Sequence, residues 1–181
     1  ELMSYSMTYK KGKIAKLFAL IYFAGIRPDL GEGEIRRIHE KESAINLASG
    51  RIAVTAHIAK TDTERPVTIM DNLKVWLDAY EGFPIIPVNG KNDYAHIRKK
   101  FGLQKDETRH SFISHHVAIY RSLAEAAYQS GNSESMIRKH YLTFPTTEEG
   151  KQFFSIVPDK ATGEAVFSDQ KFENIQTLKA I

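Results

Sequence analysis

The chain has 181 residues, of which 42% are hydrophobic, and it carries a formal net charge of +3. This length suits one domain with a substantial core, and the 10 Phe, 8 Tyr and single Trp exclude a largely disordered chain. The absence of cysteine excludes disulfide frameworks and thiolate metal sites, and no apolar run approaches the roughly 20 residues of a membrane-spanning helix.

The first half of the chain predicts helices around a small sheet. Residues 13–26 form a nearly continuous apolar stretch that stops at a glycine and a proline, which is typical of a buried helix. Residues 35–45 carry isoleucines at helical spacing, and residues 50–69 alternate apolar and polar side chains on both sides of KTDTER, which predicts a β-hairpin. Between Asp71 and Tyr80 we predict a helix that Asp71 caps, with four inward side chains: Leu73, Val75, Trp76 and Leu77.

The second half predicts further helices. Residues 83–89 read as a loop, and residues 93–102 predict a short basic helix. Residues 106–131 show one long helical pattern that must break or turn near Gly131, and SESMIRKHY follows it. Thr147 could cap a short helix that presents Phe153, Phe154, Ile156 and Val157. The order of elements predicts an α+β, mostly helical fold with a small antiparallel sheet.

Charge is unevenly distributed along the chain. Residues 145–181 contain six acidic residues and four lysines, so the remaining residues carry a net charge of +5. Basic residues gather between Lys91 and Arg121. Such a cluster suits a phosphate-rich partner, although a solvated, charged helix face produces the same pattern.

Four short stretches now occur together, in order: AGIRP with Arg27, IAKTDTERPVTI with Lys60, DETRHSF with Arg109, and GNSESMIRKHY with Tyr141. Their order and spacing resemble the catalytic domain of the tyrosine recombinases, the phage integrase family. That family has G-x-R after an apolar helix, K-T in a hairpin turn, H-x-x-R-H-[TS]-F, and G-[HW] followed nine residues later by a tyrosine. Tyr141 lies nine residues after Asn132, which occupies the His or Trp position.

The resemblance implies an integrase-like catalytic domain that cleaves and rejoins DNA through a 3′-phosphotyrosine. Arg27 and Arg109 would clamp the phosphate, because a planar, permanently charged guanidinium suits its oxygens. Tyr141 would attack it, and Lys60 would protonate the leaving oxygen. Neither a metal nor another cofactor would be required. The implied partners are double-stranded DNA and further copies of the chain on that DNA, in the cytoplasm and at the nucleoid, with no membrane.

The chain departs from the family pattern at several positions. Asp106 replaces the first histidine of H-x-x-R, and its carboxylate would repel developing charge unless a neighbouring cation neutralises it, or would act as a base toward Tyr141. Asn132 can still donate one amide hydrogen bond. Glu34 is the best match to the acidic residue that follows the first arginine in the family, and His110 matches a histidine that we interpret as structural support.

The division of the chain follows from the resemblance. We expect a catalytic core over residues 1–144, a tail over residues 145–181 that docks on a neighbouring protomer, and no N-terminal DNA-clamping domain. The alternatives are a degenerate member that only binds DNA and an enzyme similar to type IB topoisomerases. We predict DNA contacts from five basic residues: Arg65, Lys99, Lys100, Lys105 and Arg138.

Overall fold

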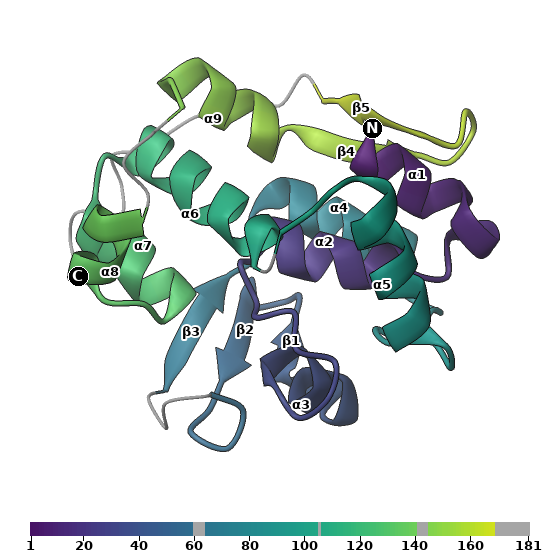
Figure 1. The fold of residues 1–181 in the computed structure, drawn as a ribbon, viewed down its shortest axis with the longest axis horizontal. Coiled ribbons are helices and arrows are strands. Elements are labelled where there is room, and N and C mark those ends of the chain that lie inside the picture. The colour runs from purple at the N-terminus through teal and green to yellow at the C-terminus, as the bar shows by residue number, and fades with distance from the viewer. Residues whose placement is uncertain (60–63, 105, 141–144, 169–181) are drawn as a thin grey trace.

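The computed structural model describes residues 1–59, 64–104, 106–140 and 145–168. Figure 1 shows most of the helices gathered above a small sheet, with one short helix beside the lower part of the sheet. The predicted α+β, mostly helical class with a small antiparallel sheet is confirmed. The helices are α1 (Leu2–Thr8), α2 (Ala15–Phe23), α3 (Glu34–Glu40), α4 (Asp71–Ala79), α5 (Gly90–Lys100), α6 (Glu107–Tyr120), α7 (Leu123–Ser130), α8 (Glu134–His140) and α9 (Thr147–Phe154), with short 3-10 turns at Tyr9–Gly12 and Glu42–Ala44.

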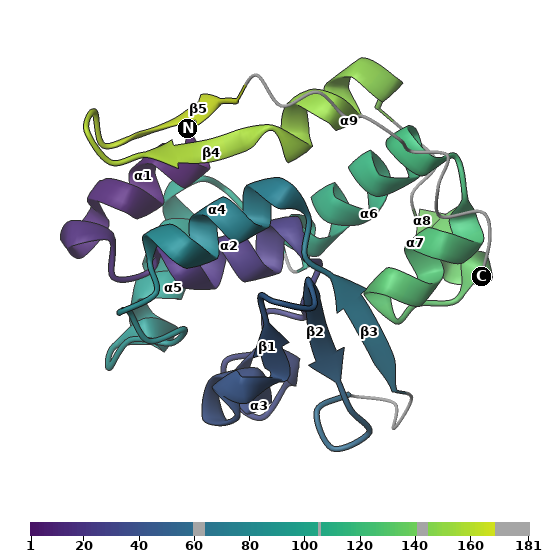
Figure 2. The same ribbon diagram turned by 180° about the vertical axis from the view of Figure 1, so that it is seen from behind.

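Helix α2 lies at the centre of the core, as its apolar sequence predicts. Eight of its nine residues are buried, and it packs against α4 and α6. Continuous burial around a helix requires neighbours on every side, so α2 fixes the positions of the helices around it. The loop after α2, which contains Arg27, leads from the core toward α3 (Figure 2).

The sheet has three antiparallel strands in the order β1 (Ile45–Asn46), β2 (Arg51–Val54) and β3 (Arg65–Thr68). The β2–β3 pair, with Ile52 opposite Val67, confirms the predicted hairpin. Alternate side chains of β2 are buried, which matches the two-residue period of a strand. The predicted turn residue Lys60 lies outside the described residues.

Several local predictions were wrong or incomplete. Met70 occupies the N-cap of α4 and Asp71 is its first helical residue, while Val75 is 38% exposed rather than inward. Helix α9 is capped by Thr146 in a capping box with Glu149, one residue before the predicted cap Thr147. The long pattern over residues 106–131 breaks at the predicted glycine but also at Arg121, which adopts a left-handed conformation between α6 and α7.

The segment after residue 144 packs on the rest of the chain. Helix α9 lies along α6, and the hairpin of β4 (Ile156–Asp159) and β5 (Glu164–Phe167) contacts α1 and α4. Phe153 and Phe154 are buried against rings of Phe23 and Phe112, so the domain itself covers this pair. Residues 169–181 lie outside the described residues, and docking of the tail on another protomer stays a prediction.

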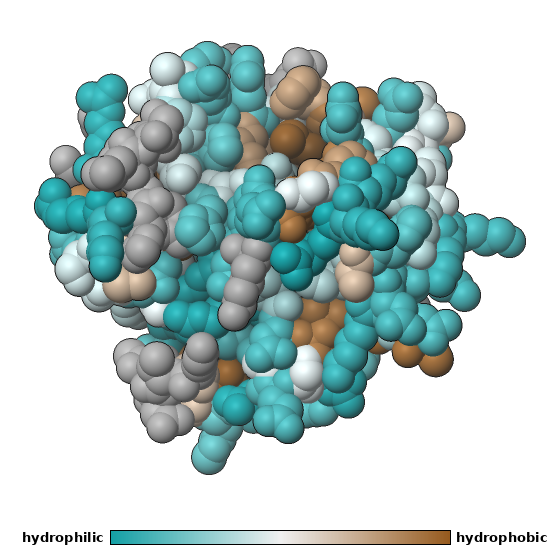
Figure 3. Space-filling model, viewed as in Figure 1, coloured by the Kyte–Doolittle hydropathy of each residue, from teal (hydrophilic) through white to brown (hydrophobic). Residues whose placement is uncertain are grey.

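Figure 3 shows that the face seen in Figure 1 is largely hydrophilic, with small separate hydrophobic areas. Among the described helices, none is both long and apolar enough to cross a bilayer.

Candidate active site

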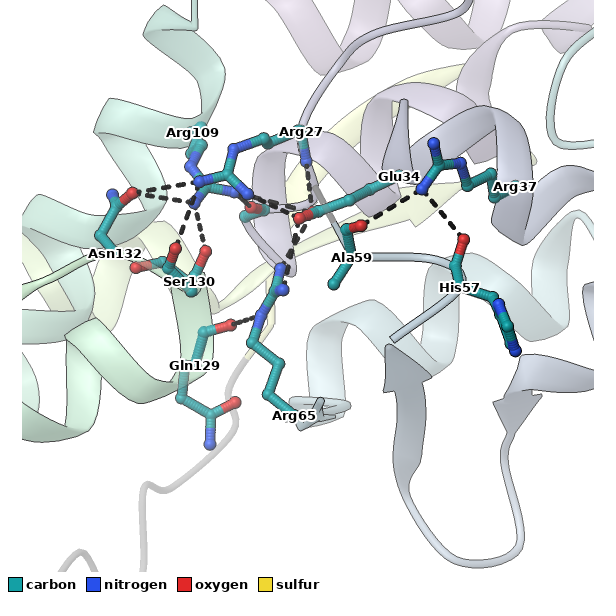
Figure 4. Close-up of polar contacts among 12 residues, drawn as sticks. Arg27, Glu34, Arg37, His57, Ala59, Arg65, Arg109, Gln129, Ser130 and Asn132 are labelled. Carbon is teal, nitrogen blue, oxygen red and sulfur yellow. Dashed lines mark hydrogen bonds and ion pairs between the residues drawn. The ribbon is translucent and has the colours of Figure 1, made fainter. Parts of the chain in front are cut away.

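The candidate site is built around one buried carboxylate, that of Glu34 at the first position of α3. Its side chain has no exposed surface. The Nη1 of Arg27 donates to Oε1 at 2.7 Å, and Arg65 donates to both oxygens at 3.3 and 2.9 Å. Arg109 forms a longer ion pair with Glu34, with its Nη1 3.9 Å from Oε2. Figure 4 shows the three guanidinium groups converging on this carboxylate from the loop after α2, from β3 and from α6.

The C-terminal end of α7 holds the same three arginines. The carbonyl of Gln129 accepts from Nε of Arg65, that of Ser130 from Nη2 of Arg109, and that of Gly131 from Nη2 of Arg27. These carbonyls belong to the helix end that carries partial negative charge and lacks intrahelical partners. Each arginine is therefore fixed by both Glu34 and the end of α7.

Asn132 joins the two arginines that the family resemblance assigns to the phosphate. Its Oδ1 accepts from Nη2 of Arg109 at 3.2 Å and from Nη2 of Arg27 at 3.5 Å. Because the oxygen faces both arginines, the amide nitrogen faces away from them (Figure 4). Within the described residues this nitrogen donates to no partner, so its two hydrogens can serve an incoming acceptor.

Two glycines shape the backbone around the arginines. Gly25 has a φ of 61°, and a Cβ there would lie 2.4 Å from the ring of Phe112; its carbonyl accepts from Nη1 of Arg109 at 2.8 Å. Gly131 has a φ of 64°, and its Cβ would lie 2.7 Å from Nη1 of Arg65. Both positions therefore require glycine for backbone conformation and for space. Gly131 is the glycine of the G-[HW] element.

The cluster has an excess of positive charge. Burial raises the pKa of Glu34, but the hydrogen bonds and charge of Arg65, together with the charges of Arg109 and Arg27, outweigh burial and hold the pKa below its ordinary value. One ionised carboxylate thus faces three arginines. The side chains of Arg65 and Arg109 are each 4% exposed and that of Arg27 is 20% exposed, so Arg27 is the member nearest to solvent.

A groove of about 890 Å³ opens beside the cluster. Its walls come from the loop over residues 28–33, from α3, and from one face of α5 with Lys91, Tyr94 and Arg98. Asp106 also lines it, at the N-cap of α6 with a left-handed φ of 61°, and it forms no ion pair with a described residue. A carboxylate therefore borders the groove where the family pattern has a histidine.

The structure brings together part of the predicted site. Arg27, Arg109, Asn132 and Glu34 meet, although they come from four separate segments. His110 is half-buried and follows Arg109 on α6. Lys60, Lys105 and Tyr141 lie outside the described residues.

Among the predicted DNA-contacting residues that the structure describes, one is buried and three are exposed. Arg65 was expected there, but it is buried by its contacts with Glu34 and Gln129. Lys100 lies over the ring of Tyr5, at the contact with α1. Lys99 on α5 and Arg138 on α8 are exposed.

Sequence reasoning missed the role of α7 and the position of Arg65. A signal for Arg65 was available, because it lies two residues before Val67, and residues two apart on a strand face the same side. Val67 is fully buried. The carbonyls of residues 129–131 carried no such signal, because every residue has a backbone carbonyl and the sequence does not show which of them accept a hydrogen bond.

Over the described ranges, no three His, Asp or Glu side chains come close enough to hold a metal ion. Comparison with models of known protein families, with curated proteins and with solved structures finds no match to this chain.

Proposed function

We propose that the chain is the catalytic domain of a site-specific DNA recombinase that cleaves and rejoins DNA through a 3′-phosphotyrosine intermediate. The observation that supports it most is the meeting of Arg27, Arg109 and Asn132. They come from three motifs of the family pattern, separated by up to 105 residues, and they share hydrogen bonds. A chance resemblance of short motifs gives no reason for these side chains to share one site.

The arrangement suits a phosphodiester. Attack on phosphorus builds negative charge on the nonbridging oxygens, and preorganised donors stabilise that charge most where they are already held in place. Arg27 and Arg109 are held by Glu34 and by α7, and the amide nitrogen of Asn132 supplies a further donor. In this proposal Tyr141 is the nucleophile and Lys60 is the general acid.

The partner would be double-stranded DNA, with further copies of the chain assembled on it at the nucleoid. Lys91, Arg98 and Arg37 border the groove beside Arg27 and would meet neighbouring phosphates. Such contacts fix the position of the duplex without reading its sequence. Binding should therefore weaken steeply as the salt concentration rises.

A second function is favoured by one observation, the position of Asp106. Its carboxylate borders the groove without an ion pair to a described residue, and it would repel the charge that develops on the phosphate. A chain limited in this way would bind DNA and cleave it slowly or not at all. Replacement of Asp106 by His distinguishes the two cases. Faster cleavage in Asp106→His than in the parent chain indicates an enzyme that Asp106 slows, whereas no cleavage in either protein indicates a DNA-binding module.

The test uses a pool of nicked duplexes with randomised sequence around the nick, because the nick lets the cleaved fragment diffuse away and traps the covalent product. The protein and its Tyr141→Phe variant are incubated with the pool and separated on a denaturing gel. A slower, protease-sensitive DNA band is expected from the parent chain and not from Tyr141→Phe.

Tyr128→Phe is the matched control, since Tyr128 is an exposed tyrosine on α7. It should form the adduct as the parent chain does. An adduct that persists in Tyr141→Phe would refute the assigned nucleophile. If the parent chain and Asp106→His both bind DNA without forming an adduct, the result supports a DNA-binding module and not a recombinase.

A further inference from the structure

Helix α5 presents a row of hydrogen-bond donors to the groove beside Arg27. Lys91, Tyr94 and Arg98 all line the groove, and their spacing of three and four residues places them on one side of the helix. A different side of α5 contacts α1 and the turn that follows it, through Asp93, His96 and Lys100. The side that faces the groove is therefore not needed to dock α5 on the N-terminal helices.

Tyr94 is the member of this row whose hydroxyl the fold does not use. The residue is 9% exposed, and its ring packs against that of Phe18 with 5.7 Å between centroids. Its hydroxyl has no hydrogen-bond partner among the described residues, although a buried tyrosine usually finds one. The oxygen is not one of the fully enclosed polar atoms that lack a partner, so it keeps access to the groove. A donor is therefore available there for a ligand.

Two charged neighbours act on this hydroxyl without a hydrogen bond to it. The guanidinium of Arg98 lies over the ring, 5.7 Å from its centroid, and Asp106 is near enough for its charge to act on the phenol. Burial raises the pKa of Tyr94 to about 12, while the charge of Arg98 lowers it and that of Asp106 raises it. The hydroxyl thus keeps its proton at neutral pH, and it is a neutral donor beside the charged donors of Lys91 and Arg98.

The chemistry of this row suits the phosphates of a nucleic acid backbone. Lysine, arginine and tyrosine side chains are all common donors to such phosphates. Seven residues separate Lys91 from Arg98, roughly 10 Å along the helix axis, so the donors form a row rather than a single point. A strand with regularly spaced phosphates fits a row of this kind.

We propose that the hydroxyl of Tyr94 donates a hydrogen bond to a substrate phosphate that flanks the reacting one, beside Lys91 and Arg98, and so fixes the backbone in the groove. The inference rests on the proposed function, because both phosphates would belong to the same DNA. A free phosphate ester offers the same oxygens and is the other source of this chemistry.

The test removes the hydroxyl alone. Tyr94→Phe keeps the ring that packs against Phe18. Tyr80→Phe is the matched control, because Tyr80 is also buried, also has a raised pKa, and lies outside the groove. Lys91→Met is the reference for the loss of a charged phosphate contact.

The first readout is the Kd for an intact DNA duplex, measured by fluorescence anisotropy at several salt concentrations. Tyr94→Phe should raise the Kd about tenfold, as loss of a hydrogen bond to a charged group does, and Tyr80→Phe should leave it unchanged. The dependence on salt should stay as steep as in the parent chain, because a neutral hydroxyl displaces no counterion. Lys91→Met should make that dependence shallower by about one counterion.

The second readout is stability, which separates a binding role from a structural one. A buried hydroxyl without a partner costs free energy, so Tyr94→Phe should unfold at the same denaturant concentration as the parent chain or at a higher one. A hydroxyl that supports the fold would give the opposite result.

The third readout follows Tyr94 in the parent chain, so it does not depend on any variant. Tyrosine is labelled with carbon-13 at Cζ, and the signal of Tyr94 is assigned by its nuclear Overhauser effects to Phe18. The duplex and inorganic phosphate are titrated in separate samples. A saturable shift of this signal is expected with the duplex.

Three results would overturn the inference: a Kd in Tyr94→Phe equal to that in Tyr80→Phe, a salt dependence as shallow as that of Lys91→Met, or a Tyr94 signal that responds to neither probe. A less stable Tyr94→Phe would do the same, because the hydroxyl would then serve the fold.

The outcomes also separate this inference from the proposed function. An adduct that forms equally well in the parent chain and in Tyr94→Phe, with equal Kd values, would keep the recombinase and reject the role of Tyr94. The expected binding pattern without any adduct would keep the role of Tyr94 and reject the recombinase. A saturable response to inorganic phosphate in a chain that binds no duplex would keep the phosphate site, with a free phosphate ester as its ligand, and reject the DNA function.

Discussion

Helix α6 borders two buried regions that differ in how their ionisable groups are accommodated. At its N-terminal end Arg109 joins a cluster in which Glu34 contacts three arginines. Further along, His116 lies among the rings of Phe112, Tyr120 and Phe154, and its Nδ1 has no hydrogen-bond partner among the described residues. The first region keeps its ionisable group charged by pairing it, and the second keeps its ionisable group neutral by excluding water.

The pKa values reflect this difference. Arginine contacts hold the pKa of Glu34 below its ordinary value in spite of burial, so the carboxylate remains ionised. Burial alone lowers the pKa of His116 to about 4, so the imidazole remains neutral at pH 7. Substitutions should therefore destabilise the fold most in the charged region. Acid should destabilise it most in the aromatic region.

The largest expected effect comes from removing the charge at the centre of the first region. Glu34→Gln leaves three partly or fully buried arginines without their carboxylate, and breaking a buried ion pair in this way costs about 3–5 kcal/mol of the free energy of unfolding. Denaturant unfolding measures it. Glu40→Gln, which removes only the exposed partner of Arg36, should change stability by less than about 0.5 kcal/mol. Equal costs in the two variants would contradict the central role of Glu34.

The second prediction concerns acid and the aromatic region. The pKa of His116 is about 4 in the folded chain, against 6.5 in the absence of burial. The unfolded chain therefore binds the extra proton between these values, and stability falls by roughly 3 kcal/mol as the pH drops from 6.5 to 4. Glu34, with a lowered pKa, contributes a loss only below about pH 4.5.

His116→Phe tests this window. It should reduce the dependence of the free energy of unfolding on pH between 6.5 and 4. His115, whose pKa is also lowered by burial, continues to contribute there, and the loss at lower pH stays in place. His57→Gln, which removes an exposed histidine, controls for the missing titratable group. A slope that is unchanged in His116→Phe would mean that another group causes it.

The third prediction concerns the space that Gly131 gives to Arg65. Gly131→Ala places a side chain in a left-handed conformation, which costs about 1–2 kcal/mol, and also displaces the guanidinium. Gly50→Ala is a matched control, because Gly50 has the same φ of 64° and nothing within 4 Å of its Cβ position. Unfolding experiments should show a greater cost at Gly131, and the difference measures the displacement of Arg65. Identical costs would show that Arg65 moves aside freely.

The smallest expected effect lies at the edge of the aromatic region. Thr146→Ala removes the cap of α9, which should cost about 1 kcal/mol. Hydrogen exchange should then speed up at the amide of Glu149, which donates to the Thr146 hydroxyl. Unchanged exchange there would show that packing of Phe153 and Phe154, and not the cap, holds the start of α9.

The sequence predicted the helices and the hairpin, and which residues share the site, better than it predicted the helix caps. The apolar pattern was sufficient for α2 and for the β2–β3 hairpin, because burial follows from the spacing of apolar residues. Motif spacing predicted that Arg27, Arg109, Asn132 and Glu34 belong to one site. Caps were placed one residue away from their true positions at Met70 and Thr146. Thr147 has the same side chain as Thr146, and Met70 makes no side-chain cap that its residue type could signal.

What sequence could not supply was the pairing within the site. Whether Arg65 faces DNA or Glu34 depends on where β3 lies relative to α3 and α7, and this is decided by packing over long distances in the chain. The backbone acceptors at residues 129–131 are set by where α7 ends, and that end is fixed by the left-handed Gly131. Gly131 was predicted as a break, but not as the residue that arranges the arginines.

The three consecutive carbonyls at the end of α7 also bear on the order in which the site can be completed. A ribosome delivers Arg27, Glu34, Arg65 and Arg109 before it delivers residues 129–131, so the emerging chain holds its cations without the acceptors that position them. The nascent protein can collapse around α2 and form its hairpin early, because those contacts lie within the portion already made. The arginine cluster is complete only when the last turn of α7 emerges, and a chain that ends before this turn would be folded in part yet lack the carbonyls that hold the three arginines.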